Sequence, residues 1–266
     1  MTMPELLKDK AIVLTGAGQG LGEATAFVLA EAGAKLMLLD VNEDTLKAVA
    51  GQLASAGHTV ETRTCNISRE EDVSAAAAST RERYGRCDGL VNNAGVVGFT
   101  PLEDLSLEEW NRLISVNLTG TFLCIKHFGR LMLEQRSGSI VTITSTAASI
   151  PQSKSGAYSP SKAGATILAR QAGMEWGEHG IRSNVVAPGA MWTPMTRPFQ
   201  SDPEAVARRT QRIASRRIAD PREIGQVIAF LLSDLASYIN GANIDVDGGL
   251  RQMMLSLMPR PGVNKM

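Results

Sequence analysis

The chain has 266 residues, of which 44% are hydrophobic and 20% are charged, a composition typical of globular proteins. Lys plus Arg and Asp plus Glu both number 27, so the net charge is zero and favours neither nucleic acid nor an anionic membrane as partner. Three cysteines lack metal-ligand spacing, no apolar run is long enough to cross a membrane, and the N-terminus has no signal-peptide pattern. We therefore expect a cytoplasmic protein without a metal site.

The first predicted element is an apolar strand, Ala11 to Leu14, which runs into a glycine-rich turn and then a helix. The turn reads T-G-A-G-Q-G-L-G from Thr15 to Gly22, and the helical sequence Glu23 to Ala32 ends at Gly33, a typical C-cap. Glycines let the backbone approach a phosphate, and the helix N-terminus supplies free N–H groups and a positive dipole. We expect the cofactor to contact Gly16, Gln19, Gly20, Leu21 and Gly22.

A second apolar strand, Lys35 to Leu39, ends at Asp40, which lies 18 residues after Gly22. In dinucleotide-binding folds, a carboxylate near this place binds the ribose 2′-hydroxyl of NAD and repels the 2′-phosphate of NADP. The next residue, Val41, is not basic, so the sequence favours NAD as the cofactor. Alternatively, Asp40 has no cofactor role and is an acidic residue at the N-terminus of the helix that follows it.

Helices and strands alternate along the rest of the chain. The predicted helices are 42–56, 69–84, 157–179 and 221–233, and residues 107–134 form one long helix or two. The predicted strands are 59–64, 89–92, 139–144, 182–187 and 243–246. This alternation predicts an α/β fold with a doubly wound parallel sheet between two helical layers, in one Rossmann-type domain over residues 1–266. Residues 189–216 form an irregular insert and residues 250–266 a Met-rich tail. Asn117 is a poor residue inside a helix and indicates a kink or a functional role.

Ser145 follows the predicted strand 139–144, so it lies at the carboxyl edge of the sheet, where open α/β sheets bind ligands. Tyr158 and Lys162 are four residues apart and share one face of a helix. An ammonium beside a phenol favours the phenolate, and lowering a Tyr pKa by about 3 units from ~10 needs roughly 4 kcal/mol. Such a phenol is an acid/base group at neutral pH. A Tyr/Lys pair alone also arises by chance, so its weight depends on the surrounding motifs.

Together these motifs resemble the short-chain dehydrogenase/reductase family, single-domain type, from about Lys8 to Gly249. The resemblance is carried by Thr15 to Gly22, Asn92-Asn93-Ala94-Gly95, Asn117, Ser145, Tyr158-x-x-x-Lys162, Pro188-Gly189 with Thr193, and Val246-Asp247-Gly248-Gly249. The separation of 13 residues between Ser145 and Tyr158 is also similar to the family pattern.

The resemblance implies hydride transfer between NAD and an alcohol or carbonyl carbon. Tyr158 would exchange the proton and Ser145 would stabilise the charge on the reacting oxygen. Lys162 would lower the Tyr158 pKa and bind the nicotinamide ribose, and Asn117 would hold a water linking Lys162 to solvent. The other cofactor contacts that it implies are Asn66, Ile67, Asn93, Ala94, Gly95, Pro188, Gly189, Met191 and Thr193. The family usually forms homotetramers through the helices around 107–134 and 157–179 and the final strand.

The chain departs from the family pattern at three positions outside the chemistry. Asn66 stands where the family usually has Asp, but its carbonyl can still accept from the adenine amino group. Met191 replaces a frequent Ile, and Asn240 replaces a common Thr.

The substrate pocket is expected to include Val97, Trp192 and Met195 beside Ser145 and Tyr158, with Val96 and Phe99 as further apolar lining. These residues favour a small, uncharged, hydrophobic secondary alcohol or ketone, cyclic ones included. The tail either covers a pocket with Met253, Met254, Leu257 and Met258 or is a frayed terminus. Arginines cluster in the insert at 208, 209, 212, 216 and 217, either as an anion site or as a solvated face.

Two other functions are compatible with the fold. An NADPH-dependent 3-oxoacyl-type ketoreductase would share the chemistry, but Asp40 and Val41 argue against it. A non-catalytic nucleotide-binding regulator would share the cofactor site, but such a sensor has no use for Ser145, Tyr158 and Lys162 as a set.

Overall fold

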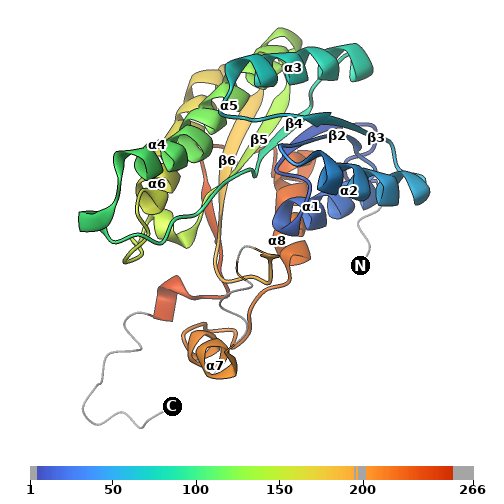
Figure 1. Ribbon diagram of the computed structural model, residues 1–266. Helices are drawn as coiled ribbons and strands as arrows, with labels where there is room; N and C mark the ends of the chain where they lie inside the picture. Colours follow the sequence, from blue (N-terminus) through green and yellow to red (C-terminus); the bar gives the residue numbers. More distant parts are fainter. Residues whose placement is uncertain (1–4, 195, 197–201, 254–266) are drawn as a thin grey trace.

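A seven-stranded sheet, in which every pair of neighbouring strands is parallel, lies at the centre of the computed structural model, which describes residues 5–194, 196 and 202–253 (Figure 1). Its strands follow the order β3-β2-β1-β4-β5-β6-β7. Their bounds are β1 Ala11–Thr15, β2 Lys35–Asp40, β3 Val60–Thr64, β4 Gly89–Asn92, β5 Gly138–Ile143, β6 Ile181–Pro188 and β7 Asn243–Val246. The predicted fold class is confirmed, and each predicted strand is present to within a residue or two.

Helices cover both faces of the sheet and enclose two hydrophobic cores. On one face lie α1 (Gly20–Glu31), α2 (Glu43–Ser55) and α8 (Pro221–Leu232), and on the other α3 (Glu70–Tyr84), α5 (Thr121–Gln135) and α6 (Tyr158–Trp176). Two further helices are α4 (Leu107–Ile114), which leads into α5, and α7 (Pro203–Gln211), which lies in the insert away from the sheet (Figure 1). This is the three-layer arrangement that the alternating pattern predicts.

The strands form where apolar side chains run without interruption. All five residues of β1 are buried, because helices cover both faces of this central strand. The edge strand β3 is only partly buried and carries charged residues such as Glu61 and Arg63. At α8, Asp220 accepts from the backbone N–H of Arg222 and forms a capping box with Glu223, so this helix begins where the sequence predicts.

The predicted helix over 107–134 is interrupted by a π-helical segment, Ser115–Gly120, between α4 and α5. Asn117 lies in this segment and is 1% exposed. A π-helical turn adds a residue to the α-helical spiral and is frequent at functional sites. The irregularity that Asn117 indicates in the sequence is therefore present, and it turns the Asn117 side chain toward the loop after β4.

The order of the strands reverses beside β1, since the chain runs outward from β1 through β2 to β3 and then returns to β4 on the other side. Crevices at such switch points, at the carboxyl ends of the strands, are where α/β sheets bind ligands. Over the described part of the chain, no helix has the length and apolar character needed to cross a membrane.

Candidate active site

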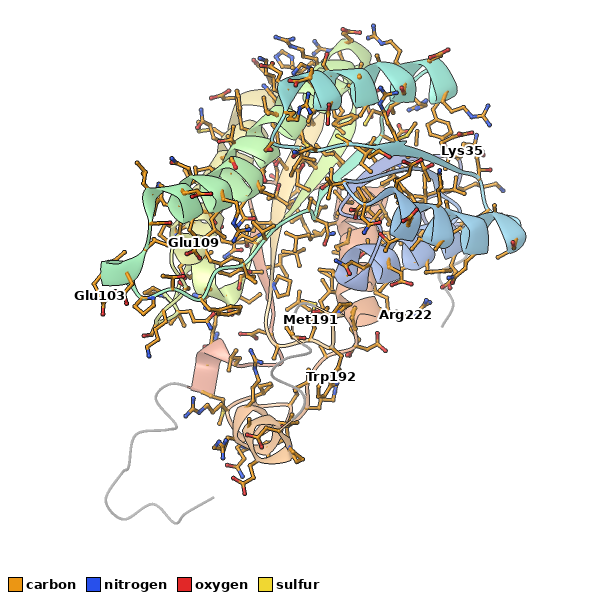
Figure 2. The ribbon with its side chains drawn as sticks, in the orientation of Figure 1. Lys35, Glu103, Glu109, Met191, Trp192 and Arg222 are labelled. Atoms are coloured by element: carbon orange, nitrogen blue, oxygen red, sulfur yellow. The ribbon has the colours of Figure 1, made fainter. Side chains whose placement is uncertain are left out.

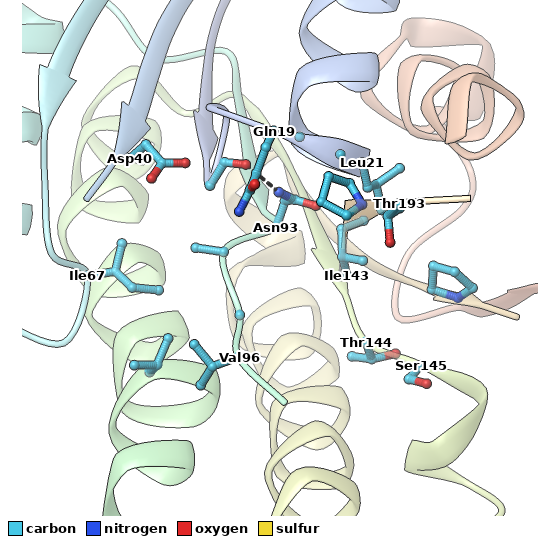
Figure 3. Close-up of a pocket in the computed structure, with 18 of the residues that line it drawn as sticks. Gln19, Leu21, Asp40, Ile67, Asn93, Val96, Ile143, Thr144, Ser145 and Thr193 are labelled. Carbon is cyan, nitrogen blue, oxygen red and sulfur yellow. Dashed lines mark hydrogen bonds between the residues drawn. The ribbon is translucent and has the colours of Figure 1, made fainter. Parts of the chain in front are cut away.

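A cavity of about 510 Å³ opens at the carboxyl edge of the sheet, at the switch point between β1 and β4. Its described lining includes every residue that the sequence assigns to cofactor contacts: Gly16, Gln19, Gly20, Leu21, Gly22, Asp40, Asn66, Ile67, Asn93, Ala94, Gly95, Tyr158, Lys162, Pro188, Gly189, Met191 and Thr193. Ser145 lines it as well. Figure 3 shows Asp40 and Ser145 at opposite ends of the group of lining residues. An elongated ligand would therefore contact both ends.

The glycine turn leaves room for backbone contacts that any side chain would block. Gly16 has φ +65°, and a Cβ there would lie 2.7 Å from the Cα of Ala94. A Cβ on Gly22 would lie only 1.8 Å from the carbonyl oxygen of Gly16. The N-terminal turn of α1 therefore packs directly on the turn, and Gln19, the N-cap residue, provides no side-chain cap. The N-terminus of α1 is thus a site suited to a phosphate group.

Thr15 and Asn93 hold the glycine turn against the loop after β4. The Thr15 hydroxyl oxygen accepts from the backbone N–H groups of Asn93 and Ala94, both at 3.0 Å. The Asn93 side-chain amide donates to the carbonyl oxygens of Thr15 and Gly16, both at 3.0 Å. These contacts fix one wall of the cavity before any ligand binds.

Asp40 lies at the end of β2 and braces the same turn. One carboxylate oxygen accepts from the Gly18 N–H and the other from the Asn42 N–H, each at 2.9 Å. The residue directly after Asp40 is Val41, which is not basic. Val41 is exposed and also lines the cavity. The carboxylate is therefore fixed in position at the end of the cavity that faces β2.

Asn117 ties the loop after β4 to helix α6. Its side-chain oxygen accepts from the Val96 N–H at 2.8 Å, while its amide donates to the Val96 carbonyl and to the Ser161 hydroxyl. Gly95 lies between two groups of the predicted catalytic set, since a Cβ there would be 3.1 Å from Asn117 Oδ1 and 3.2 Å from Lys162 Nζ. Asn117 does not line the cavity itself and acts on its geometry from one layer behind.

Ser145 and Tyr158 face the catalytic end of the cavity. Ser145 follows β5, and its hydroxyl oxygen accepts from the Ala147 N–H at 3.1 Å. Tyr158 is the first residue of α6, and Lys162 lies one turn later, buried, with Nζ donating to the Ile143 carbonyl at 3.0 Å. Lys162 Nζ is 6.0 Å from the centre of the Tyr158 ring. Three of the four side chains predicted for catalysis, Ser145, Tyr158 and Lys162, therefore line the same cavity.

The electrostatics differ from the sequence-based expectation at Tyr158. Burial raises the pKa of the Tyr158 phenol, and its hydrogen bond with Ser145 opposes this only in part. The Lys162 ammonium donates to the Ile143 carbonyl rather than to the phenol. Burial in turn lowers the pKa of Lys162 to about 8. Both groups are thus shifted by desolvation toward their neutral forms.

Some predicted substrate residues are not among the residues that line this cavity, and their role stays a prediction. Val97 and Trp192 do not line the cavity, and Trp192 is 41% exposed. Met195 and the tail residues Met254, Leu257 and Met258 lie outside the described residues. Sequence reasoning assigned no cofactor or substrate role to several lining residues: Val41, Cys65, Val116, Ile143, Thr144, Pro194 and Thr196. Cys65, Ile143 and Thr144 each follow or end a strand at the same sheet edge, a signal that could have found them.

Comparison with known proteins agrees with this geometry. Residues 16–251 match the family model described as "Enoyl-(Acyl carrier protein) reductase". Levodione reductase of Leifsonia aquatica is 38% identical over 250 residues, covering 91% of this chain and 94% of that protein. The chain belongs to the short-chain dehydrogenase/reductase family. As a member of that family it is an oxidoreductase.

Two more relatives bear on the substrate and the cofactor. The cis-4-hydroxycyclohexanecarboxylate dehydrogenase of Sinomonas cyclohexanicum is 39% identical over 248 residues, covering 93% of this dehydrogenase/reductase and 98% of that protein. A solved structure, a putative NAD(P) dependent gluconate 5-dehydrogenase from Beutenbergia cavernae with bound NADP, superimposes with a TM-score of 0.89. It is 34% identical and covers 95% of this chain and 100% of its own.

Proposed function

We propose that this protein is an NAD-dependent dehydrogenase that interconverts a secondary alcohol and a ketone, with ring-containing compounds as substrates. The observation that carries the proposal is that Ser145 and Tyr158 line the same cavity as the glycine turn and Asp40. Levodione reductase and the hydroxycyclohexanecarboxylate dehydrogenase are named for cyclic compounds, which supports the substrate class.

The cavity fits a nicotinamide dinucleotide. The glycine turn and the N-terminus of α1 would hold the pyrophosphate, and Asp40 would bind the adenosine ribose. Lys162 would bind the other ribose, while Pro188, Gly189 and Thr193 would contact the nicotinamide. When bound, the nicotinamide supplies the acceptor or donor of hydride.

The residues of the chain would handle the proton and the oxygen. Ser145 donates a hydrogen bond to the reacting oxygen and keeps it beside Tyr158. During oxidation the Tyr158 phenolate takes the alcohol proton and becomes the phenol, and during reduction the phenol returns this proton to the carbonyl oxygen. Lys162 is buried beside Tyr158, and its protonated ammonium stabilises the phenolate form that takes this proton. Asn117 keeps Val96 and Ser161 in register with these groups.

NAD is preferred over NADP in this proposal because of Asp40. A 2′-phosphate would place its negative charge near the carboxylate, with no neighbouring basic residue in the sequence to offset it. One unit of like charge at 4 Å costs roughly 1 to 4 kcal/mol, depending on the effective dielectric constant. The relative with bound NADP makes this preference the first property to measure.

Replacing Tyr158 with Phe tests the chemistry. Tyr158→Phe should keep the affinity for NAD, measured by calorimetry, and lose turnover of cyclohexanol-type alcohols by more than about 100-fold. Turnover of the variant near that of the wild type would contradict the assigned role of the phenol. A panel of cyclic and open-chain secondary alcohols with NAD and with NADP would define the substrate class and the cofactor.

We also propose that the protein is a cytoplasmic homotetramer assembled through α5 and α6 and the final strand. Exposed apolar side chains on these helices, Phe122, Ile167 and Met174, support an association surface. Sedimentation velocity should show a tetramer for the wild type and smaller species for Met174→Glu. A monomeric wild type at micromolar concentration would contradict the assembly.

A further inference from the structure

A second cavity, of about 340 Å³, lies between α7 and the turn after β7. The described residues that line it are Ala190, Ala205, Arg208, Arg209, Arg212, Ile213 and Leu250. Three of these seven are arginines, and the other four are apolar. The cavity thus combines a cationic rim with an apolar floor, which is the combination that an amphipathic anion requires.

Arg208 and Arg212 at this cavity differ in their acidic neighbours. Arg208 forms ion pairs with Asp202 and Glu204, both exposed. The Arg212 side chain has no hydrogen bond or ion pair with any described residue. Basic residues near a helix C-terminus interact favourably with the helix dipole. That interaction alone does not explain why three arginines line one cavity. Because the net charge of the whole chain is zero, these arginines form a locally positive region of the surface.

The apolar part of the lining contains one buried side chain and three partly buried ones. Ile213 is 1% exposed, and Ala190, Ala205 and Leu250 complete the apolar surface. The aliphatic stems of the arginines extend this surface, while their charged ends stay near water. A ligand that fits would present a ring or short chain to the floor and a planar anion to the guanidinium groups.

The cavity borders the same chain segment as the first one. Ala190 stands between Gly189 and Met191, both of which line the active-site cavity. Figure 2 shows Met191 and Trp192 on the segment that joins the sheet to α7. The two cavities therefore border the same segment of backbone.

We propose that this cavity binds a carboxylate carried by the substrate, remote from the reacting carbon. This inference rests on the proposed function and narrows it to cyclic secondary alcohols that bear a distal carboxylate. It replaces the uncharged substrate that the sequence alone favours. The printed name of the Sinomonas cyclohexanicum relative describes a compound of this class, although the arginines of this chain carry the argument.

The test compares a charged and a neutral ring alcohol. Wild-type protein should show a kcat/KM for 4-hydroxycyclohexanecarboxylate at least 10-fold above that for 4-methylcyclohexanol, and Arg212→Gln should remove most of this advantage through KM. Loss of one charge-assisted, bidentate contact accounts for a change of that size. Arg217→Gln is the matched control, because Arg217 belongs to the same cluster but pairs with Glu223 and does not line the cavity.

Calorimetry with cyclohexanecarboxylate separates this inference from the proposed chemistry, because that compound has no carbinol and cannot react. The wild type, Arg217→Gln and Tyr158→Phe should bind it alike, whereas Arg212→Gln should bind it at least 10-fold more weakly. Equal binding by the wild type and Arg212→Gln, or no binding by either, would overturn the inference and leave a solvated arginine face. Failure of both alcohols to react, with carboxylate binding intact, would overturn only the proposed reaction.

Discussion

The preference for NAD can be tested by removing the charge of Asp40. In Asp40→Asn, a 2′-phosphate no longer meets a carboxylate, which relieves roughly 1 to 4 kcal/mol of repulsion. NAD loses a hydrogen bond to a charged acceptor, which is worth about 1.5 to 3 kcal/mol. Even the two lower values together, about 2.5 kcal/mol, change the ratio of the NADP and NAD dissociation constants by about 60-fold toward NADP.

The variant also disturbs the glycine turn, and the measurement must allow for this. Asp40 accepts from the N–H groups of both Gly18 and Asn42, and an Asn side chain offers only one accepting atom. One of these N–H groups therefore loses its acceptor, and both cofactors should bind less well for that reason. Because NAD and NADP share the pyrophosphate, this loss cancels in the ratio of their dissociation constants.

The assay is calorimetric titration of the wild type and Asp40→Asn with each cofactor at two salt concentrations. The repulsive part of the wild-type preference should weaken with added salt, since charges near the surface are screened. Asp44→Asn is the matched control, because it removes a charge from the start of α2 without lining the cavity. A ratio in Asp40→Asn within two-fold of the wild-type value would refute the electrostatic argument for NAD.

Three further predictions follow from close contacts and burial. Gly22→Ala should lower the melting temperature and weaken NAD binding more than 10-fold, because the added Cβ would lie 1.8 Å from the Gly16 carbonyl oxygen. The control is Gly51→Ala, which should leave stability unchanged or raise it, because a Cβ there would meet nothing within 4 Å. Gly248→Ala should raise the KM for the alcohol with NAD affinity unchanged, because its Cβ would lie 2.5 Å from Ser215 Oγ at the base of the insert. Because the pKa of Lys162 is about 8 when folded and near 10.5 when unfolded, the unfolded state binds more protons between these values. Relative to Lys162→Met, the wild type should therefore gain up to about 3 kcal/mol of unfolding free energy as pH rises from 8 to 10.5, measured by urea denaturation; no change in this difference would contradict it.

The fold and the position of the cofactor cavity follow from local sequence signals. Apolar runs ending in Thr15, Asp40 and Asn92 define strands, and the residues just after such runs meet at one sheet edge because the strands are parallel. The glycine turn is recognisable in the sequence because its backbone conformation requires glycine. A Cβ on Gly22, for example, would lie 1.8 Å from the Gly16 carbonyl oxygen. These features depend on a few neighbouring residues, which is why a single sequence reveals them.

Other properties depend on how distant segments pack, and the sequence does not contain them in local form. The direction of the Tyr158 pKa is one example, because it depends on burial and on whether Lys162 points at the phenol or at the Ile143 carbonyl. The place of Trp192 is another, since this apolar residue does not line the cavity and is 41% exposed. The sequence motifs identify the predicted catalytic residues, but the protonation states of these residues depend on their surroundings in the folded protein.

The π-helical segment at Asn117 shows how the fold joins these two levels. The Asn117 amide uses both of its N–H bonds, one to Val96 and one to Ser161, so it is already committed to connecting the loop after β4 with α6. Val96 lines the cavity, and Ser161 precedes Lys162 on the helix that begins at Tyr158. A regular α-helix would turn residue 117 elsewhere and break this connection. The irregular turn therefore couples the wall of the cavity to the proposed acid/base group, and any proton path through Asn117 must use its oxygen atoms.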